Sequence, residues 1–250
     1  MKLLVSDYDG TISIDGEVSK KTIDKLRQWV EAGNLFVLAT GRSLNITTGI
    51  IEKDQLPVDY IICNNGSVTY DANYKVINES TLSMDIVNMI INDSTIQNSH
   101  YFVISEEKER YLLEGYQEGK ETINYYTKIL KRKDLNDLHV YAIDTRYDTA
   151  EIMKKKETIL RDKYDGIASI NPNIETIDFT PLGVTKDSAV QKIVKKYKDL
   201  ESIIAVGDGL NDLIMIENNI GYTMEWATQE IKDKAIGVIT SIDEILDKYM

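Results

Sequence analysis

The chain has 250 residues, and its 41 Asp and Glu against 29 Lys and Arg give a formal net charge of −12. This acidic balance argues against nucleic acid as a partner, because a phosphate backbone requires a basic surface. A single cysteine, Cys63, excludes an internal disulfide framework and fits a reducing compartment. Since the chain shows neither a signal-like start nor an apolar run long enough to span a membrane, we expect no membrane association and a cytoplasmic location.

The first third of the chain predicts alternating strands and helices. Residues 2–6 form an apolar strand, and Ser19 is a suitable N-cap for an amphipathic helix that ends near Gly33. The apolar run 35–39 is typical of a parallel strand covered on both faces. A second helix and a third strand, 60–63, complete the pattern. The fold class is therefore predicted as α/β, with a doubly wound, Rossmann-like parallel sheet.

The middle of the chain differs in character. Residues 68–77 predict a hairpin, and the segment 84–180 predicts a mixture of helices and short strands without the polar, Gly-containing loops that follow the earlier strands. The expected helices lie near 84–93, 117–132 and 147–161, and the expected strands at 101–104, 111–113, 139–143 and 174–177. This segment is interpreted as an inserted α+β domain.

The α/β pattern resumes near the end of the chain. A helix near 185–198 precedes an apolar strand at 202–206, and two shorter strands follow. We therefore expect a core domain formed by residues 1–80 and 184–250, with residues 81–183 as a domain inserted in it.

Two carboxylates come directly after the first strand, at Asp7 and Asp9. Side chains two residues apart on an extended backbone project to the same side, so these acids repel each other unless a cation or a proton lies between them. Gly10 allows a sharp turn after them, and Thr11 adds a hydroxyl. The arrangement predicts a site for a divalent metal and an anionic substrate at the edge of the sheet.

Further polar side chains are expected at the same edge. Thr40 and Arg42 follow the second strand, Lys186 begins a helix, and Asp208 to Asp212 follow the strand 202–206. Together they supply a carboxylate nucleophile, a proton donor, oxygen ligands for Mg²⁺ and a cation for phosphoryl oxygens. The pattern therefore indicates phosphoryl transfer.

These motifs resemble the haloacid dehalogenase-like phosphatase superfamily, in its Cof-type branch. The resemblance rests on Asp7-Tyr8-Asp9-Gly10-Thr11, Thr40-Gly41-Arg42, Lys186 and Gly207-Asp208-Gly209-Leu210-Asn211-Asp212, in the order of the family. Asn64-Asn65-Gly66 also looks like an Asn-Gly element of that branch. The inserted domain, residues 81–183, matches the branch's large α/β cap by size and position alone. The resemblance implies that residues 1–80 and 184–250 form the catalytic core and that the cap selects the substrate.

The resemblance implies a role for each matching residue. Asp7 would be the nucleophile that forms an aspartyl-phosphate, Asp9 the general acid/base, and Thr40 and Lys186 the groups that hold the phosphoryl group. The implied Mg²⁺ ligands are Asp7, Asp9 through its backbone carbonyl, Asp208 and Asp212. The implied phosphate- or substrate-binding positions are Gly10, Thr11, Gly41, Arg42, Asn65 and Asn211.

Two segments depart from the family pattern. Asp187 follows Lys186 where glycine is common, and Glu225-Trp226 stands where relatives often carry Gly-Asn. These departures leave the substrate contacts at the rim of the core domain open. By simpler interpretations, Asp212 could cap the next helix and Arg42 could form a structural ion pair.

The predicted activity is Mg²⁺-dependent hydrolysis of a small phosphomonoester. A phosphotransferase or mutase on the same fold is an alternative, because Asp9 would serve either reaction. A receiver-type regulatory module also gathers acids, a Thr and a Lys at a sheet edge, but such modules are about half this length and lack an insertion. Neither the substrate nor the oligomeric state follows from the sequence.

Overall fold

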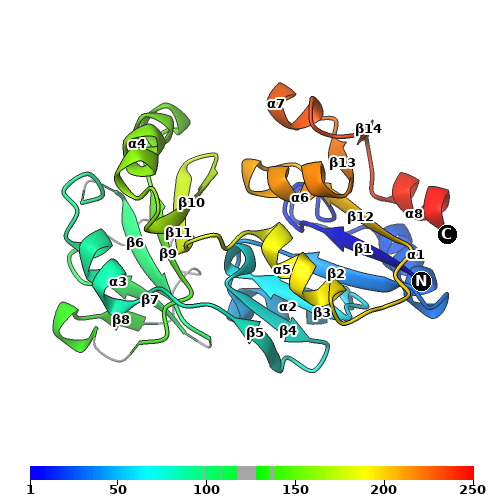
Figure 1. Cartoon of the computed structure of the whole chain (residues 1–250), viewed down its shortest axis with the longest axis horizontal. Helices are drawn as coiled ribbons and strands as arrows, with labels where there is room; N and C mark the ends of the chain where they lie inside the picture. The colour runs from blue at the N-terminus through cyan, green and yellow to red at the C-terminus, as the bar shows by residue number, and fades with distance from the viewer. Residues whose placement is uncertain (98, 108, 117–127, 136–137) are drawn as a thin grey trace. The chain divides into compact units, whose positions relative to one another are not determined.

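A computed structural model describes residues 1–97, 99–107, 109–116, 128–135 and 138–250 (Figure 1). The chain divides into two compact units, each with its own sheet. The first unit comprises Met1–Arg42, Thr47–Asn78 and Thr185–Met250, and the second comprises Ser43–Ile46 and Glu79–Val184. The substrate-selecting role of the inserted domain stays a prediction.

The first unit is built on an eight-stranded sheet in the order β14-β13-β12-β1-β2-β3-β4-β5. The first six strands in this order pair in parallel, and β4 runs antiparallel to β3. The strands are β1 (Lys2–Ser6), β2 (Leu35–Ala39), β3 (Tyr60–Cys63), β4 (Val68–Asp71), β5 (Val76–Glu79), β12 (Ser202–Gly207), β13 (Ile220–Met224) and β14 (Gly237–Ile239).

Helices cover both faces of this sheet. Leu3 and Val5 of β1 pack in one apolar cluster with Val190 of α5. On α1, Leu26 and Trp29 are buried, and this helix packs against β2 and α8. The helices of the unit are α1 (Lys20–Glu31), α2 (Leu44–Asp54), α5 (Lys186–Val194), α6 (Leu213–Asn218), α7 (Gln229–Lys232) and α8 (Asp243–Tyr249). The predicted doubly wound α/β fold is confirmed.

The order of the strands places the switch point of the sheet between β1 and β12. From β1 the chain proceeds to β2 and β3 on one side, and from β12 it proceeds to β13 and β14 on the other. The loops after β1 and β12 therefore diverge and leave a crevice at the carboxyl edge, which is where open α/β sheets bind ligands. Asp7 follows β1 directly, and Asp208 follows β12.

The second unit contains a six-stranded sheet in the order β10-β11-β9-β6-β7-β8. All neighbouring strands are antiparallel except β7 and β8. Side chains of α3 and α4 share one apolar cluster with the sheet, so both helices cover the same face. The elements are β6 (Tyr101–Ser105), β7 (Arg110–Leu113), β8 (Lys128–Leu130), β9 (Ala142–Arg146), β10 (Ala168–Asn173), β11 (Thr176–Pro181), α3 (Met84–Ile91) and α4 (Ala150–Lys163).

Several predicted elements of the second unit were wrong in type or position. Residues 117–127 of the helix expected at 117–132 lie outside the described residues. Residues 128–130, expected in the same helix, form the strand β8, which pairs with β7. The strand expected at 139–143 is β9, shifted toward its C-terminal end. β10 was not predicted from the sequence. It forms a hairpin with β11, and the chain turns at Ile174, where a strand was expected to begin.

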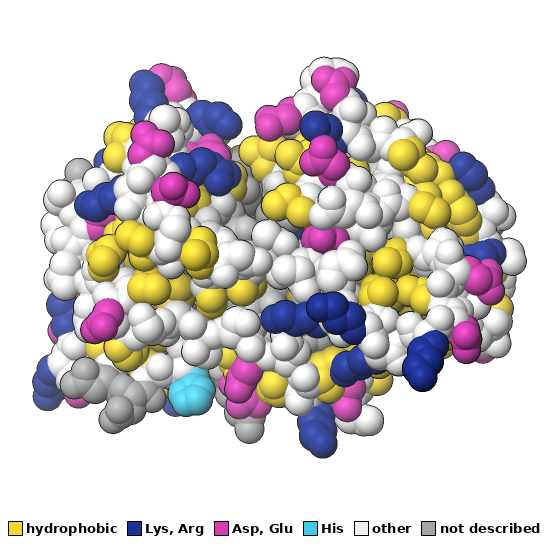
Figure 2. Space-filling view, viewed as in Figure 1, with side chains coloured by type: hydrophobic (Ala, Val, Ile, Leu, Met, Phe, Trp, Pro, Cys, Tyr) yellow, Lys and Arg dark blue, Asp and Glu magenta, His cyan; other side chains and the backbone are white. Residues whose placement is uncertain are grey.

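The surface of the chain carries both signs of charge. On the face shown in Figure 2, basic and acidic side chains are interspersed and form no continuous basic surface. Within the described ranges, none of the helices has both the length and the apolar character needed to cross a bilayer.

The helix that carries Lys186 depends on a close approach by Gly66. This glycine has a φ of +107°, and a Cβ there would lie 2.2 Å from the Thr185 carbonyl oxygen. Gly66→Ala should therefore lower the free energy of unfolding by about 2–5 kcal/mol, because it combines an unfavourable backbone conformation with a clash. Denaturant unfolding measures this loss.

Gly16→Ala is the matched control. Gly16 also has a positive φ, of +82°, but a Cβ there would have nothing within 4 Å. Gly16→Ala should lower the free energy of unfolding by only about 1–2 kcal/mol, because it meets the unfavourable backbone conformation without a clash. Equal losses for the two variants would contradict the proposed clash.

Candidate active site

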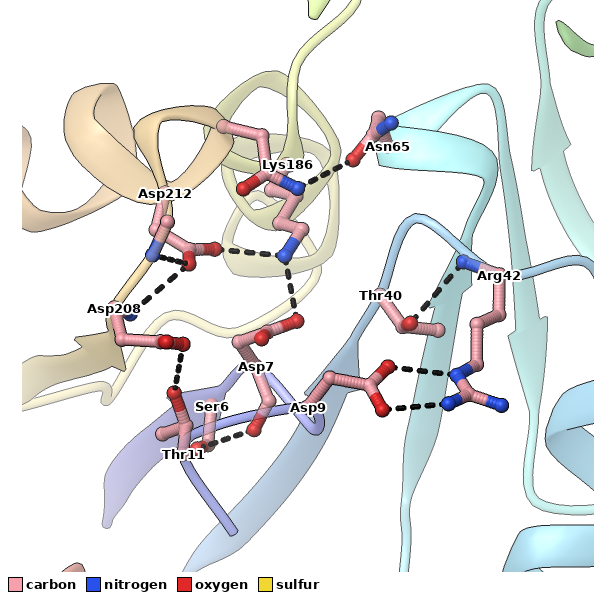
Figure 3. A network of polar contacts seen from close by, with 12 residues as sticks. Ser6, Asp7, Asp9, Thr11, Thr40, Arg42, Asn65, Lys186, Asp208 and Asp212 are labelled. Carbon is pink, nitrogen blue, oxygen red and sulfur yellow. Dashed lines mark hydrogen bonds and ion pairs between the residues drawn. The ribbon is translucent and has the colours of Figure 1, made fainter. Parts of the chain in front are cut away.

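The centre of the site is an ion-paired lysine between two acids. The Nζ of Lys186 donates to Oδ1 of Asp7 and to Oδ1 of Asp212, both at 2.7 Å (Figure 3). The side chains of Lys186 and Asp212 are fully buried, and that of Asp7 is 10% exposed. Because buried charges require compensation, the lysine and the acids fix each other's positions.

Local structure places each member of this group. The Asp7 N–H donates to the Val206 carbonyl at 2.9 Å, which extends the pairing of β1 with β12. Lys186 is the first residue of α5, whose start is fixed by a reciprocal capping box between Thr185 and Ser188. The lysine therefore reaches the carboxyl edge of the sheet from a capped helix end.

Asp212 connects the lysine to the loop after β12. Its Oδ2 accepts hydrogen bonds from the N–H groups of Asp208, at 3.2 Å, and Gly209, at 3.0 Å. Asp208 in turn accepts a hydrogen bond from the Thr11 hydroxyl at 2.9 Å. Asp212 thus organises the loop and lies beside the other acids, but its side chain does not cap α6, so the interpretation that it caps the next helix is wrong.

The acidic group fits a divalent cation. Asp7, Asp208 and Asp212 each offer a carboxylate oxygen, and these oxygens lie within 4.8 Å of one another. Oδ2 of Asp7 and Oδ2 of Asp208 accept no hydrogen bond from the residues that the structure describes. Since three carboxylates face one lysine, hard oxygen donors and negative charge remain for a metal ion such as Mg²⁺.

Burial makes Asp7 and Asp208 hard to ionise. It raises the pKa of Asp7 to about 8, with Lys186 opposing the shift and the charges of Asp212 and Asp208 adding to it. Burial also raises the pKa of Asp208 to about 6, against the Thr11 hydrogen bond. Burial alone would lower the pKa of Lys186, but Asp212 and Asp7 together raise it above its ordinary value.

Asp9 is directed away from this group (Figure 3). Its carboxylate accepts two hydrogen bonds from Arg42, from Nε at 2.6 Å and from Nη2 at 2.5 Å, and it is half exposed. The Arg42 guanidinium also lies 5.8 Å from the centre of the Tyr8 ring, and Tyr8 donates to Asp54. The structural ion pair suggested for Arg42 is present, while its substrate contact and the metal contact of the Asp9 carbonyl stay predictions.

Of the remaining predicted residues, Thr40 and Gly41 follow β2, Asn65 follows β3, and Asn211 lies in the turn after β12. The Thr40 hydroxyl oxygen accepts a hydrogen bond from the Arg42 N–H at 3.1 Å. Asn211 donates from Nδ2 to Oδ1 of Asn65 at 2.9 Å. A Cβ at Gly41 would lie 3.2 Å from the same Asn65 oxygen, so this turn accepts a larger residue only with adjustment.

Asp187 has a structural place. Its carboxylate accepts hydrogen bonds from Asn218 at 2.9 Å and Asn219 at 3.0 Å, which join α5 to the end of α6. Gln191 of the same helix is a third donor, at 3.2 Å. The departure from glycine at this position therefore stabilises the helix that carries Lys186.

One contact was missed from the sequence. Trp226 donates from its indole nitrogen to the Gly10 carbonyl at 2.9 Å, so it reaches the loop that carries Asp9. Its position just after β13, at the edge of the sheet where the motifs meet, was the signal that could have found it.

Comparison with known proteins identifies the family. A family model of haloacid dehalogenase-like hydrolases matches residues 4–245. The chain is 26% identical over 238 residues to the 5-amino-6-(5-phospho-D-ribitylamino)uracil phosphatase YcsE of Bacillus subtilis, and the match covers 94% of this chain and 88% of that protein.

Solved structures show the same fold. A HAD/Cof-like hydrolase from Plasmodium vivax superposes with a TM-score of 0.86 at 20% identity, covering 99% of this chain and 95% of that one. The HAD subclass IIB sugar phosphatase BT4131 superposes with a TM-score of 0.77 at 22% identity, covering 98% and 95%. The chain belongs to the haloacid dehalogenase-like hydrolase family, so the predicted superfamily is confirmed.

Proposed function

We propose that this chain is a Mg²⁺-dependent phosphatase that hydrolyses a small phosphorylated metabolite through an aspartyl-phosphate on Asp7. The observation that carries the proposal is the buried lysine that joins Asp7 to Asp212, with the Asp208 carboxylate close beside them. These four side chains would bring together a nucleophile, a cation that faces the phosphoryl oxygens, and the ligands for a metal ion.

Asp7 and Asp9 would divide the chemistry between them. A carboxylate oxygen of Asp7 forms a bond to phosphorus, and the bond from phosphorus to the leaving oxygen breaks. For this step Asp9 leaves its pair with Arg42 and carries a proton, which it donates to that oxygen. Asp9 then takes a proton from a water molecule, whose oxygen attacks phosphorus and breaks the bond to Asp7, so that inorganic phosphate leaves and both acids return to their starting states.

The other residues would bind and orient the phosphoryl group. Lys186 keeps the carboxylate of Asp7 in place and faces the phosphoryl oxygens, with the Thr40 hydroxyl as a second donor. Asp7 and Asp208 would hold Mg²⁺ with support from Asp212, and the ion would offset the negative charges of carboxylate and phosphate as they approach.

The relatives support a small phosphomonoester as the substrate. One is a phosphatase of a phosphorylated ribitylamino-uracil, and another is a sugar phosphatase. The membership in a hydrolase family disfavours the receiver-type module, whereas transfer to a second hydroxyl is the remaining alternative on the same site. Phosphate release, measured against formation of an isomer, separates these two reactions.

A cytoplasmic location is part of the proposal, supported by the single cysteine.

Asp7→Asn should abolish turnover. The amide cannot act as the nucleophile, so phosphate release should fall by a factor on the order of 10³ or more, while circular dichroism remains close to that of the wild type. Asp247→Asn, at an exposed position paired with Lys25, should keep the wild-type rate. Undiminished hydrolysis by Asp7→Asn would remove Asp7 from its role.

Asp9→Asn should slow both chemical steps. Loss of a general acid/base lowers rates by about 10²–10⁴-fold, and the second step also needs this group as a base. Single-turnover kinetics should therefore show slow breakdown of the phosphorylated enzyme after it forms. Wild-type rates for both steps would exclude Asp9 from proton transfer.

Mg²⁺ should stabilise the protein more strongly as pH rises. Because the pKa of Asp7 is raised to about 8 and that of Asp208 to about 6, the folded protein keeps protons that the unfolded chain has already released. These two groups alone therefore make folding less favourable as pH rises from about 4 to about 8. A cation must displace the same protons, so adding Mg²⁺ should raise Tm more at about pH 8.5 than at about pH 6.

Two variants control this measurement by differential scanning calorimetry. Asp208→Asn should reduce the Mg²⁺-dependent rise in Tm at both pH values because it removes one ligand. Asp24→Asn changes an acid that pairs with Arg27 on α1 and should leave the rise unchanged. No rise at either pH value would contradict a metal site formed by these acids, and an equal rise at both would contradict the raised pKa values of Asp7 and Asp208.

A further inference from the structure

Trp226 occupies the loop that follows β13 at the carboxyl edge of the first-unit sheet. It is 45% exposed, whereas the other tryptophan of the chain, Trp29, is fully buried. Single exposed apolar side chains are common on protein surfaces, so exposure by itself indicates nothing. The contacts of this indole and the position of its loop carry the argument.

The backbone around Trp226 is fixed. The Glu225 N–H donates to the Ile239 carbonyl at 2.9 Å, and the Ala227 N–H donates to the Met224 carbonyl at 3.0 Å. Ala227 is itself buried in an apolar cluster with Ile216. The loop therefore holds the tryptophan at a set place instead of leaving it on a free chain segment.

The indole is also fixed at its polar edge. Its nitrogen donates to the Gly10 carbonyl at 2.9 Å. Gly10 directly follows Asp9, and it lies so close to Asp208 that a Cβ there would come within 2.3 Å of Oδ2. The hydrogen bond uses the only polar atom of the indole, so the exposed remainder of the ring is apolar and lies beside the loop of the proposed acid/base.

We propose that Trp226 contacts the leaving group of the substrate and favours leaving groups that carry a planar ring. The inference rests on the proposed phosphatase function. An aromatic ring held in advance loses little conformational freedom when a ligand stacks on it.

A comparison of two substrates tests the proposal. Trp226→Ala should lower kcat/KM for p-nitrophenyl phosphate by about 3- to 10-fold, mainly through KM, because ring stacking is lost. For glycerol 3-phosphate, which has no ring, kcat/KM should change little. Trp226→Phe should recover most of the ring-dependent part, and Ile236→Ala, at an exposed apolar position, should match the wild type with both substrates.

Tryptophan fluorescence supplies a second readout. Since Trp29 is buried, the emission that acrylamide quenches belongs to Trp226. With Mg²⁺ present, saturating phenylphosphonate should protect this emission from quenching, and saturating methylphosphonate should protect it less. Trp226→Phe should lose the quenchable emission.

The outcomes separate the inference from the proposed function. An equal loss with both substrates would show that Trp226 only supports the Gly10 loop, and no loss with either would remove it from the site. Equal protection by the two phosphonates would also overturn the ring preference. If the wild type releases no phosphate from any phosphomonoester, the proposed function itself fails.

Discussion

The site depends on one buried ionic contact, that of Lys186 with Asp7 and Asp212. Removing one partner of a buried ion pair typically costs about 3–5 kcal/mol, because the remaining charge is left without compensation. The same contact aligns the proposed nucleophile and fixes the loop after β12. The lysine therefore serves the stability of the core and, in the proposed reaction, the stabilisation of charge on the phosphoryl group.

The topology of the sheet makes this contact possible. Asp7 and Asp212 come from opposite halves of the first unit, and they meet because β1 and β12 are neighbours at the switch point. The Asp9–Arg42 pair lies at the same edge but is more exposed. Rigid burial of the proposed nucleophile and greater exposure of the proposed acid/base suit their separate tasks, since Asp9 must exchange protons with a leaving group and with water.

The sequence was sufficient for the fold of the first unit and for the grouping of the motifs. Most of its parallel strands contain an apolar run, and each polar motif follows a strand or begins a helix. The second unit was harder to predict, because Lys128–Leu130 is too short to show a period and the Ile174 turn lacks glycine. The ion pair of Arg42 was one of two interpretations that the sequence left open. The Trp226 contact depends on how closely the loops after β1 and β13 approach each other, which the position of the tryptophan after a strand only suggests.

The most direct test of the account is rapid acid quench of the wild-type enzyme during turnover, followed by mapping of the phosphorylated peptide. The account predicts an acid-stable, hydroxylamine-sensitive phosphoryl group on the peptide that contains Asp7, formed and lost at rates that match phosphate release. A phosphoryl group on another residue, or phosphate release without any phosphorylated enzyme, would contradict Asp7 as the nucleophile.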